Sequence, residues 1–245
     1  MYVAGASDNW AMVDIARPDW DLAAQWISES HPSGSVVDVG CFDGGFSARL
    51  GDGIKRYGVE IHAEAAKRAT AERNVTIVGA DYADLLETPD QYDCIACFDL
   101  IEHVHDPQEL LTRLASRVKP GGSLIVGTGN ADAPAWRFMG GRYWYCWFPE
   151  HIAFISPRWS ERAAPKAGLR VERIKRFSRG RGYANFVHEA LKNLFYRTFP
   201  IALTVALRRR KLRRLGIEPA IDWDDSPPVW VSARDHFLVQ FRKDA

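Results

Sequence analysis

The sequence has few cysteines, little net charge and no long apolar run. Its 245 residues include only four cysteines, Cys41, Cys94, Cys97 and Cys146, too few for a disulfide scaffold at this length. Cys94 and Cys97 form a C-x-x-C inside the apolar run 94–98, without a second Cys or His pair at zinc spacing, so we expect inert, buried thiols. No run approaches the roughly 18 apolar residues that a transmembrane helix needs.

The N-terminus also lacks the basic region and long apolar core of a signal peptide, which makes the cytoplasm the expected location. A chain of this length can bury one large core without disulfides or a structural metal.

The net charge of +1 conceals an uneven distribution. Residues 170–214 carry 14 Lys and Arg against two Glu, a local charge of +12, so the other 200 residues carry −11. This asymmetry predicts an anionic partner for the basic stretch.

Short apolar runs alternate with helical patterns, which predicts an α/β fold with a mainly parallel sheet. Strands are expected over 35–39, 56–60, 75–79, 93–98, 123–128, 169–177 and 236–242. Helices are expected over 20–30, 63–72, 107–118 and 157–167, with another starting over 46–50. Residues 184–215 also have helical spacing, broken at Pro200, whereas the aromatic-rich segment 130–151 is expected to be a covering loop.

The most informative stretch is Val36-Val-Asp-Val-Gly-Cys-Phe-Asp-Gly-Gly45, in which a buried strand runs into a glycine turn. It departs from the dinucleotide pattern G-x-G-x-x-G, because Phe42 replaces the glycine that would allow pyrophosphate contact and Asp43 would repel a diphosphate. Glu60 follows Gly40 by 20 residues and can accept hydrogen bonds from two ribose hydroxyls. The stretch therefore predicts a ligand with a ribose but no phosphate at this turn.

This combination resembles the first motif of the class I S-adenosylmethionine-dependent methyltransferases, of the bacterial group that includes ubiquinone-pathway and glycan O-methyltransferases. Similar segments follow in the family's order: Glu60, Gly79-Ala-Asp81, the segment 99–107, the turn 118–124 and the segment 150–156. The resemblance spans residues 34–177. It implies S-adenosylmethionine as the cofactor and a seven-stranded Rossmann-like methyltransferase fold, mostly parallel with an antiparallel last strand.

The chain departs from the family in two places. Phe42-Asp-Gly44 replaces the family's common Gly-Thr/Ser-Gly, and 58 residues separate Phe177 from His236, where a short hairpin is usual. We therefore expect one domain, 1–245, with an N-terminal helical lid (1–30), a cofactor-binding core (31–177), a helical basic insertion (178–230) and the last strand (231–245).

The resemblance implies a cofactor site in which Asp38, Gly40 and Gly44 hold the methionine end, Glu60 the ribose and Asp81 the adenine. The full expected set is Asp38, Gly40, Cys41, Gly44, Glu60, Ile61, Asp81, Tyr82, Phe98 and Asp99. Structural alternatives remain for two of them: Asp38 could tie down loop amides, and Asp81 could be a helix N-cap.

Methylation of a hydroxyl requires removal of its proton, and histidine titrates near neutral pH. The candidate bases are His103 and His151, which could instead be structural, whereas His105 is expected to be an exposed loop residue. Glu102, His103 and Asp106 could form a magnesium site, but imidazole suits a hard cation poorly, so no metal is expected.

The expected acceptor is a small hydroxylated molecule such as a glycan, a lipid-linked sugar or another metabolite. The aromatic segment 130–151, with Gly140 and Gly141 as hinges, suits a lid over an acceptor with ring faces, or alternatively a cluster packed behind the sheet. Methylation at nitrogen or carbon, or a non-catalytic cofactor-binding subunit, are the alternative functions.

The basic insertion has three competing interpretations. Its apolar helical stretch beside Arg208–Arg214 suits an anionic membrane surface contacted through 184–214, which would place the protein peripherally on the inner face of the membrane. It could also be a lid or homodimer contact that binds the acidic body. Nucleic acid is not favoured, because aromatics are not interleaved with the arginines.

Overall fold

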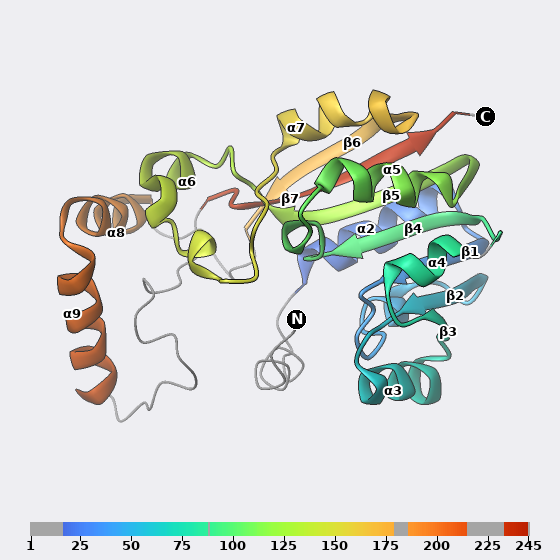
Figure 1. Cartoon of the computed structure of the whole chain (residues 1–245), viewed down its shortest axis with the longest axis horizontal. Coiled ribbons are helices and arrows are strands. Elements are labelled where there is room, and N and C mark those ends of the chain that lie inside the picture. The colour runs from blue at the N-terminus through green and yellow to red at the C-terminus, as the bar shows by residue number, and fades with distance from the viewer. Residues whose placement is uncertain (1–16, 88, 179–185, 215–232, 245) are drawn as a thin grey trace.

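A seven-stranded sheet forms the body of the protein. The computed structural model describes residues 17–87, 89–178, 186–214 and 233–244. The strands are β1 (Gly34–Val39), β2 (Ile54–Val59), β3 (Thr76–Gly79), β4 (Tyr92–Phe98), β5 (Val118–Gly129), β6 (Leu169–Phe177) and β7 (His236–Lys243). Their order is β3-β2-β1-β4-β5-β7-β6, and β7 alone of these strands runs opposite to the other six (Figure 1). The predicted fold class is confirmed.

Helices cover both faces of the sheet. They are α2 (Pro18–Ser30), α3 (Ala63–Arg73), α4 (Tyr82–Glu87), α5 (Pro107–Ser116), α6 (Pro134–Met139), α7 (Pro157–Ala163), α8 (Phe186–Thr198) and α9 (Ile201–Arg214). Ala23, Trp26 and Ile27 of α2 are buried in the cluster on one face, as the apolar spacing of 20–30 predicts. On the opposite face, α5 buries its leucines with Ile95 of β4.

The helix expected over 46–50 is a single 3₁₀ turn, Ser47–Arg49. Leu50 already has extended backbone, and β2 begins four residues later, so the chain is too short here for an α-helix. Phe46 is nevertheless fully buried, with its ring 4.7 Å from that of Phe98. The apolar pattern thus predicts the burial correctly but not the length of the element.

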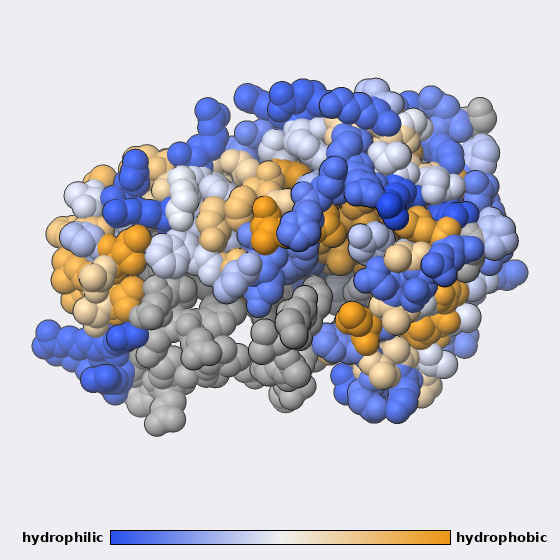
Figure 2. Space-filling view, viewed as in Figure 1, coloured by the Kyte–Doolittle hydropathy of each residue, from blue (hydrophilic) through white to orange (hydrophobic). Residues whose placement is uncertain are grey.

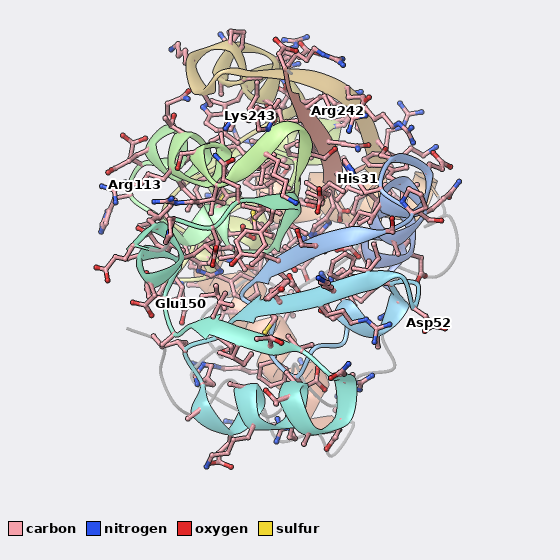
Figure 3. All side chains as sticks on the ribbon, turned by 90° about the vertical axis from the view of Figure 1, so that its right-hand side faces the viewer. His31, Asp52, Arg113, Glu150, Arg242 and Lys243 are labelled. Carbon is pink, nitrogen blue, oxygen red and sulfur yellow. The ribbon has the colours of Figure 1, made fainter. Side chains whose placement is uncertain are left out.

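The C-terminal strand is tied to the amino edge of the parallel strands. Arg242 donates to the Gly121 carbonyl at 3.0 Å, and Lys243 donates to the carbonyls of Ala115 and Val118. Figure 3 shows Arg242 with His31, which lies 3.2 Å from the guanidinium. These contacts stabilise the edge opposite to the site described below.

Part of the predicted N-terminal lid and of the basic insertion lies outside the described residues. Within the described part, the insertion forms α8 and α9, separated at Pro200 as predicted. They extend away from the sheet beyond α6 (Figure 1). Among the described helices, none combines the length and the apolar character required to span a bilayer.

Candidate active site

The predicted cofactor residues gather at the carboxyl edge of the parallel strands. β1 pairs with β2 on one side and with β4 on the other, so the loops that follow these three strands are neighbours. Asp38, the penultimate residue of β1, lies opposite Gly58, the penultimate residue of β2, and opposite Ala96 of β4. The strand order reverses between β1 and β4, which is where α/β sheets bind ligands.

The glycine turn brings bare backbone to this edge. Gly40 has φ 82°, a left-handed conformation that favours glycine, and a Cβ there would meet nothing within 4 Å. Gly44 also has positive φ, but a Cβ there would lie 3.1 Å from Val75. Gly40 therefore leaves open space for a ligand, whereas Gly44 allows the turn to pack on the protein.

Cys41 does not direct its thiol into that space. Its Sγ would lie 2.5 Å from a Cβ on Gly58, so the thiol packs under the turn beside β2. Burial raises the pKa of the Cys41 thiol, as it does for Cys94 and Cys97, and all three are free. The predicted burial of the Cys94 and Cys97 thiols is confirmed. Cys41 can line a cofactor site with its backbone but not with its thiol.

Glu60 connects the glycine turn with the segment after β2. One carboxylate oxygen accepts from the Phe42 amide and the other from the His62 amide, both at 2.8 Å. The side chain is buried, and each oxygen retains a lone pair for a further donor. This geometry suits two ribose hydroxyls and makes Glu60 a support of the turn as well.

Asp38 is a buried acid whose carboxylate accepts no hydrogen bond from the part of the chain that the structure describes. The residue is 3% exposed, and no described residue donates to its carboxylate, so the alternative role of tying down loop amides is not observed. Burial raises the pKa of Asp38 to about 7; the Arg17 guanidinium opposes this shift and Glu60 adds to it. A buried carboxylate beside open space fits the ammonium of an amino-acid ligand.

Arg17 is a site residue that the sequence analysis missed. Its guanidinium pairs with the fully buried Asp19 at 2.7 Å, reaches Asp99 at 3.1 Å and stacks over Trp20. Asp99 follows β4 in a left-handed conformation, φ 51°. No sequence signal marks this contact, because Arg17 and Asp99 are 82 residues apart.

The expected adenine side is more open. Ile61, next to Glu60, exposes 58% of its surface, which suits the face of a purine. Asp81 is exposed and one of its carboxylate oxygens accepts from the Ala83 amide, so the N-cap geometry is present. Tyr82 begins α4 and packs partly on the core.

The Phe98 ring does not face this opening. It packs on Phe46 and lies 6.2 Å from the Trp20 ring under α2. Phe98 therefore contributes backbone and packing at the site rather than an exposed ring.

Both predicted bases lie together. The His103 and His151 rings meet edge to face at 4.9 Å. Nδ1 of His103 lies 3.0 Å from the Glu150 carbonyl, and Nδ1 of His151 lies 2.9 Å from the Tyr145 carbonyl. A carbonyl only accepts, so Nδ1 carries the proton in each neutral ring and Nε2 is the basic nitrogen. Burial lowers the pKa of His151 to about 4, which keeps it neutral at pH 7.

Glu102 joins the two histidines to the sheet and to the aromatic segment. It accepts from the Tyr145 hydroxyl and, at 2.9 Å, from Thr128 of β5. Burial and the nearby Asp99 raise the pKa of Glu102. The sequence indicates Glu102 only as a possible metal ligand, and no local signal places Thr128 or Tyr145 beside it.

Glu102, His103 and His151 each offer a ligand atom within 4.8 Å of the others, a set that could hold a divalent ion. Asp106, the other residue considered for a metal, instead caps α5 by accepting from two backbone amides. Glu102 already accepts two hydrogen bonds, which an ion would have to replace in part. The absence of a resident metal stays a prediction.

The aromatic segment (residues 130–151) packs at the carboxyl edge, not behind the sheet. A Cβ on Gly129, the last residue of β5, would lie 2.8 Å from the Tyr145 ring. Its own helix α6 and two 3₁₀ turns bury Trp136, Tyr143 and Tyr145 in a separate cluster, with Trp136 stacked on Tyr143. It therefore forms a structured wall beside the histidine pair.

The strand order, the glycine turn after β1 and the two buried acids Asp38 and Glu60 together define a class I S-adenosylmethionine-dependent methyltransferase. Residues 20–174 match the family described as "Methyltransferase domain", and the chain belongs to that family. S-adenosylmethionine is its cofactor, and Asp38, the opening at Gly40 and Glu60 fit the cofactor's amino-acid and ribose parts.

Relatives of this chain carry out related chemistry. It is 30% identical over 193 residues to the ubiquinone biosynthesis O-methyltransferase of Aeromonas salmonicida (strain A449), covering 69% of this chain and 79% of the relative. Identity to the protein of the same name from Burkholderia pseudomallei (strain K96243) is 30%, covering 66% and 82%. The fold also matches N-methyltransferase NodS from Bradyrhizobium japonicum WM9 in complex with S-adenosyl-l-homocysteine, at TM-score 0.57 and 15% identity, covering 98% of this chain and 93% of NodS.

Cofactor affinity should depend on the ionisation of Asp38. Its carboxyl is neutral below a pKa of about 7, and a neutral acid cannot pair with an ammonium, so binding must remove the proton at lower pH. We expect the dissociation constant for S-adenosylmethionine to rise roughly fivefold between pH 7 and pH 6, as the ionised fraction of Asp38 falls from about one half to about one tenth. Calorimetry in buffers of different ionisation enthalpy measures both the constant and the proton release. Asp38→Asn should remove this dependence, and a flat profile in the unsubstituted protein would contradict the assignment.

Removal of Arg17 should weaken both the fold and the site. In Arg17→Ala the buried Asp19 loses its ion pair with Arg17, and we expect a loss of about 3 kcal/mol in unfolding free energy. Cofactor affinity should fall roughly tenfold, since Asp38 and Asp99 lose a nearby positive charge. Arg49→Ala is the matched control, because Arg49 also lies over Trp20 but pairs with the exposed Asp21. In this control, the unfolding free energy from denaturant titration and the cofactor affinity from calorimetry should both stay close to those of the unsubstituted protein.

Proposed function

We propose that this methyltransferase O-methylates a small hydroxylated acceptor, such as a phenol, a sugar or a glycan. The observation that carries the proposal is the histidine pair beside the aromatic segment, in which a backbone carbonyl holds Nδ1 of each ring. Similarity to ubiquinone biosynthesis O-methyltransferases supports hydroxyl chemistry. The proposed acceptor binds between His151 and the opening at Gly40.

The cofactor supplies an electrophilic methyl group, and the chain supplies alignment and a base. Holding two reactants in line contributes roughly 7–11 kcal/mol toward the barrier. The methyl group would pass from the sulfonium sulfur to the hydroxyl oxygen, with S-adenosylhomocysteine as the leaving group. The hydroxyl proton would pass to Nε2 of a histidine whose Nδ1–H is held by a backbone carbonyl. Glu102 accepts hydrogen bonds from Thr128 and the Tyr145 hydroxyl, so it orients the residues around the histidine pair.

A matched acceptor screen tests the proposal. Aromatic and sugar scaffolds are offered in three forms, with a free hydroxyl, with an amine in its place and with the hydroxyl already methylated. The proposal expects transfer of a labelled methyl group from S-adenosylmethionine to the hydroxyl form alone. Preferential labelling of the amine form would establish nitrogen methylation, and binding of cofactor without transfer to any scaffold would indicate a non-catalytic subunit.

We further propose that the reaction takes place in the cytoplasm. The four cysteines are free, three of them buried, which suits a reducing compartment. Fractionation of cells that express the full chain tests this location.

A further inference from the structure

The α8–α9 arm (residues 186–214) presents an apolar surface that the body does not cover. Five of its side chains are large, apolar and 40–61% exposed. They are Leu191 and Leu194 of α8, Phe199 between the helices, and Leu203 and Leu207 of α9. Figure 2 shows hydrophobic surface at the left end of the molecule, where Figure 1 places α8 and α9. Large apolar patches of this kind mark interaction sites.

The same arm carries a concentrated positive charge. The sequence of α9 contains six Lys and Arg and no acidic residue. Arg210, Arg213 and Arg214 are exposed and, with Ala202 and Ala206, line a shallow hollow on α9. Apolar residues occupy the first half of α9 and cations the second, and Figure 2 shows the hydrophilic end below the apolar one.

The arm is anchored to the wall of the active site. Arg142 of the aromatic segment donates to the carbonyls of Tyr196, Arg197 and Phe199, at 3.4, 3.1 and 2.9 Å. Tyr196 also packs on the buried aromatic cluster. A surface that binds to the arm is therefore held close to the carboxyl edge of the sheet.

We propose that the α8–α9 arm binds the surface of an anionic lipid bilayer. The exposed leucines and Phe199 suit the boundary between headgroups and acyl chains, and the adjacent arginines suit anionic headgroups. Helices of 13 and 14 residues are too short to span the bilayer and lie along its surface. Charge alone would suit any polyanion, but nucleic acid provides no apolar layer for the exposed leucines. Membrane binding by the arm does not depend on which acceptor the enzyme methylates.

Vesicle flotation of the full chain tests the proposal. We expect flotation with vesicles of equal parts phosphatidylglycerol and phosphatidylcholine, little with phosphatidylcholine alone, and a decrease at about 0.5 M NaCl. Arg210, Arg213 and Arg214→Gln should lower partitioning at least about 30-fold. Leu203 and Leu207→Gln should lower it while leaving the charge unchanged. The matched control replaces three exposed cations elsewhere, Lys55, Arg162 and Lys166→Gln, and should float normally.

Three results would overturn the proposal: no flotation on anionic vesicles, equal loss in the control, or full flotation of the arginine variant. A dimer in size-exclusion chromatography that the arginine variant dissociates, without flotation of the unsubstituted protein, would assign the arm to a second copy of the chain. Calorimetry with S-adenosylmethionine shows that each variant is folded. Methyl transfer to a water-soluble acceptor should stay unchanged, so failure here is separate from failure of the proposed reaction.

Discussion

Glu60→Gln is expected to weaken S-adenosylmethionine binding by at least about 100-fold, because hydrogen bonds to a charged group each contribute roughly 1.5–3 kcal/mol. The carboxylate accepts from two backbone amides, those of Phe42 and His62, and each oxygen has a further lone pair for a ribose hydroxyl. The substituted amide has almost the same shape, but its NH₂ group would face a backbone N–H. Titration calorimetry measures the change directly.

Two comparisons separate the ribose contacts from the support of the glycine turn. A 2′,3′-dideoxy analogue of the cofactor should bind the unsubstituted protein weakly and should lose little more in Glu60→Gln. If the two losses simply add, Glu60 acts on the turn and not on the ribose. Glu64→Gln is the matched control, because Glu64 is exposed on α3 and pairs with Lys67 of the same helix. Its affinity for the cofactor should stay unchanged.

Much of this cofactor site could be predicted from the sequence, because its residues follow strands directly. Asp38, Glu60 and Asp99 each come at or just after the end of an apolar run, and parallel strands place such residues on one edge. Alternation of strand and helix patterns likewise predicted the fold. The local sequence pattern is therefore enough to predict both the fold and the edge of the sheet at which these residues gather.

The remaining parts depend on distances that a local pattern does not contain. The contact of Arg17 with Asp99, and the meeting of Glu102, Thr128 and Tyr145, join segments that are far apart in the chain. The prediction of a helix over 46–50 was wrong for another reason, because the early start of β2 leaves room only for a single 3₁₀ turn. Apolar spacing shows which face is buried, but it does not show how much chain is available.

Replacement of either histidine of the pair should lower turnover strongly. General-base catalysis contributes typically 10²–10⁴-fold, so we expect His151→Gln and His103→Gln each to lower kcat by about 100-fold or more at saturating cofactor. The two rings meet at 4.9 Å and the reaction releases one proton, so the pair acts as one unit. The double variant should therefore be hardly slower than the slower single variant. His105→Gln, in the exposed loop between them in sequence, is the matched control and should retain full turnover.

The pH dependence distinguishes this base from the acid that binds the cofactor. His151 has a pKa lowered to about 4 and a base acts when unprotonated, so kcat should not fall because of His151 between pH 8 and about pH 6. Asp38, with a pKa of about 7, must lose a proton before it can pair with the cofactor, so the KM for S-adenosylmethionine should rise over the same interval. Steady-state rates at several cofactor concentrations separate the two quantities. If both single histidine variants keep more than about a tenth of the kcat, alignment alone accounts for the reaction and the pair is structural.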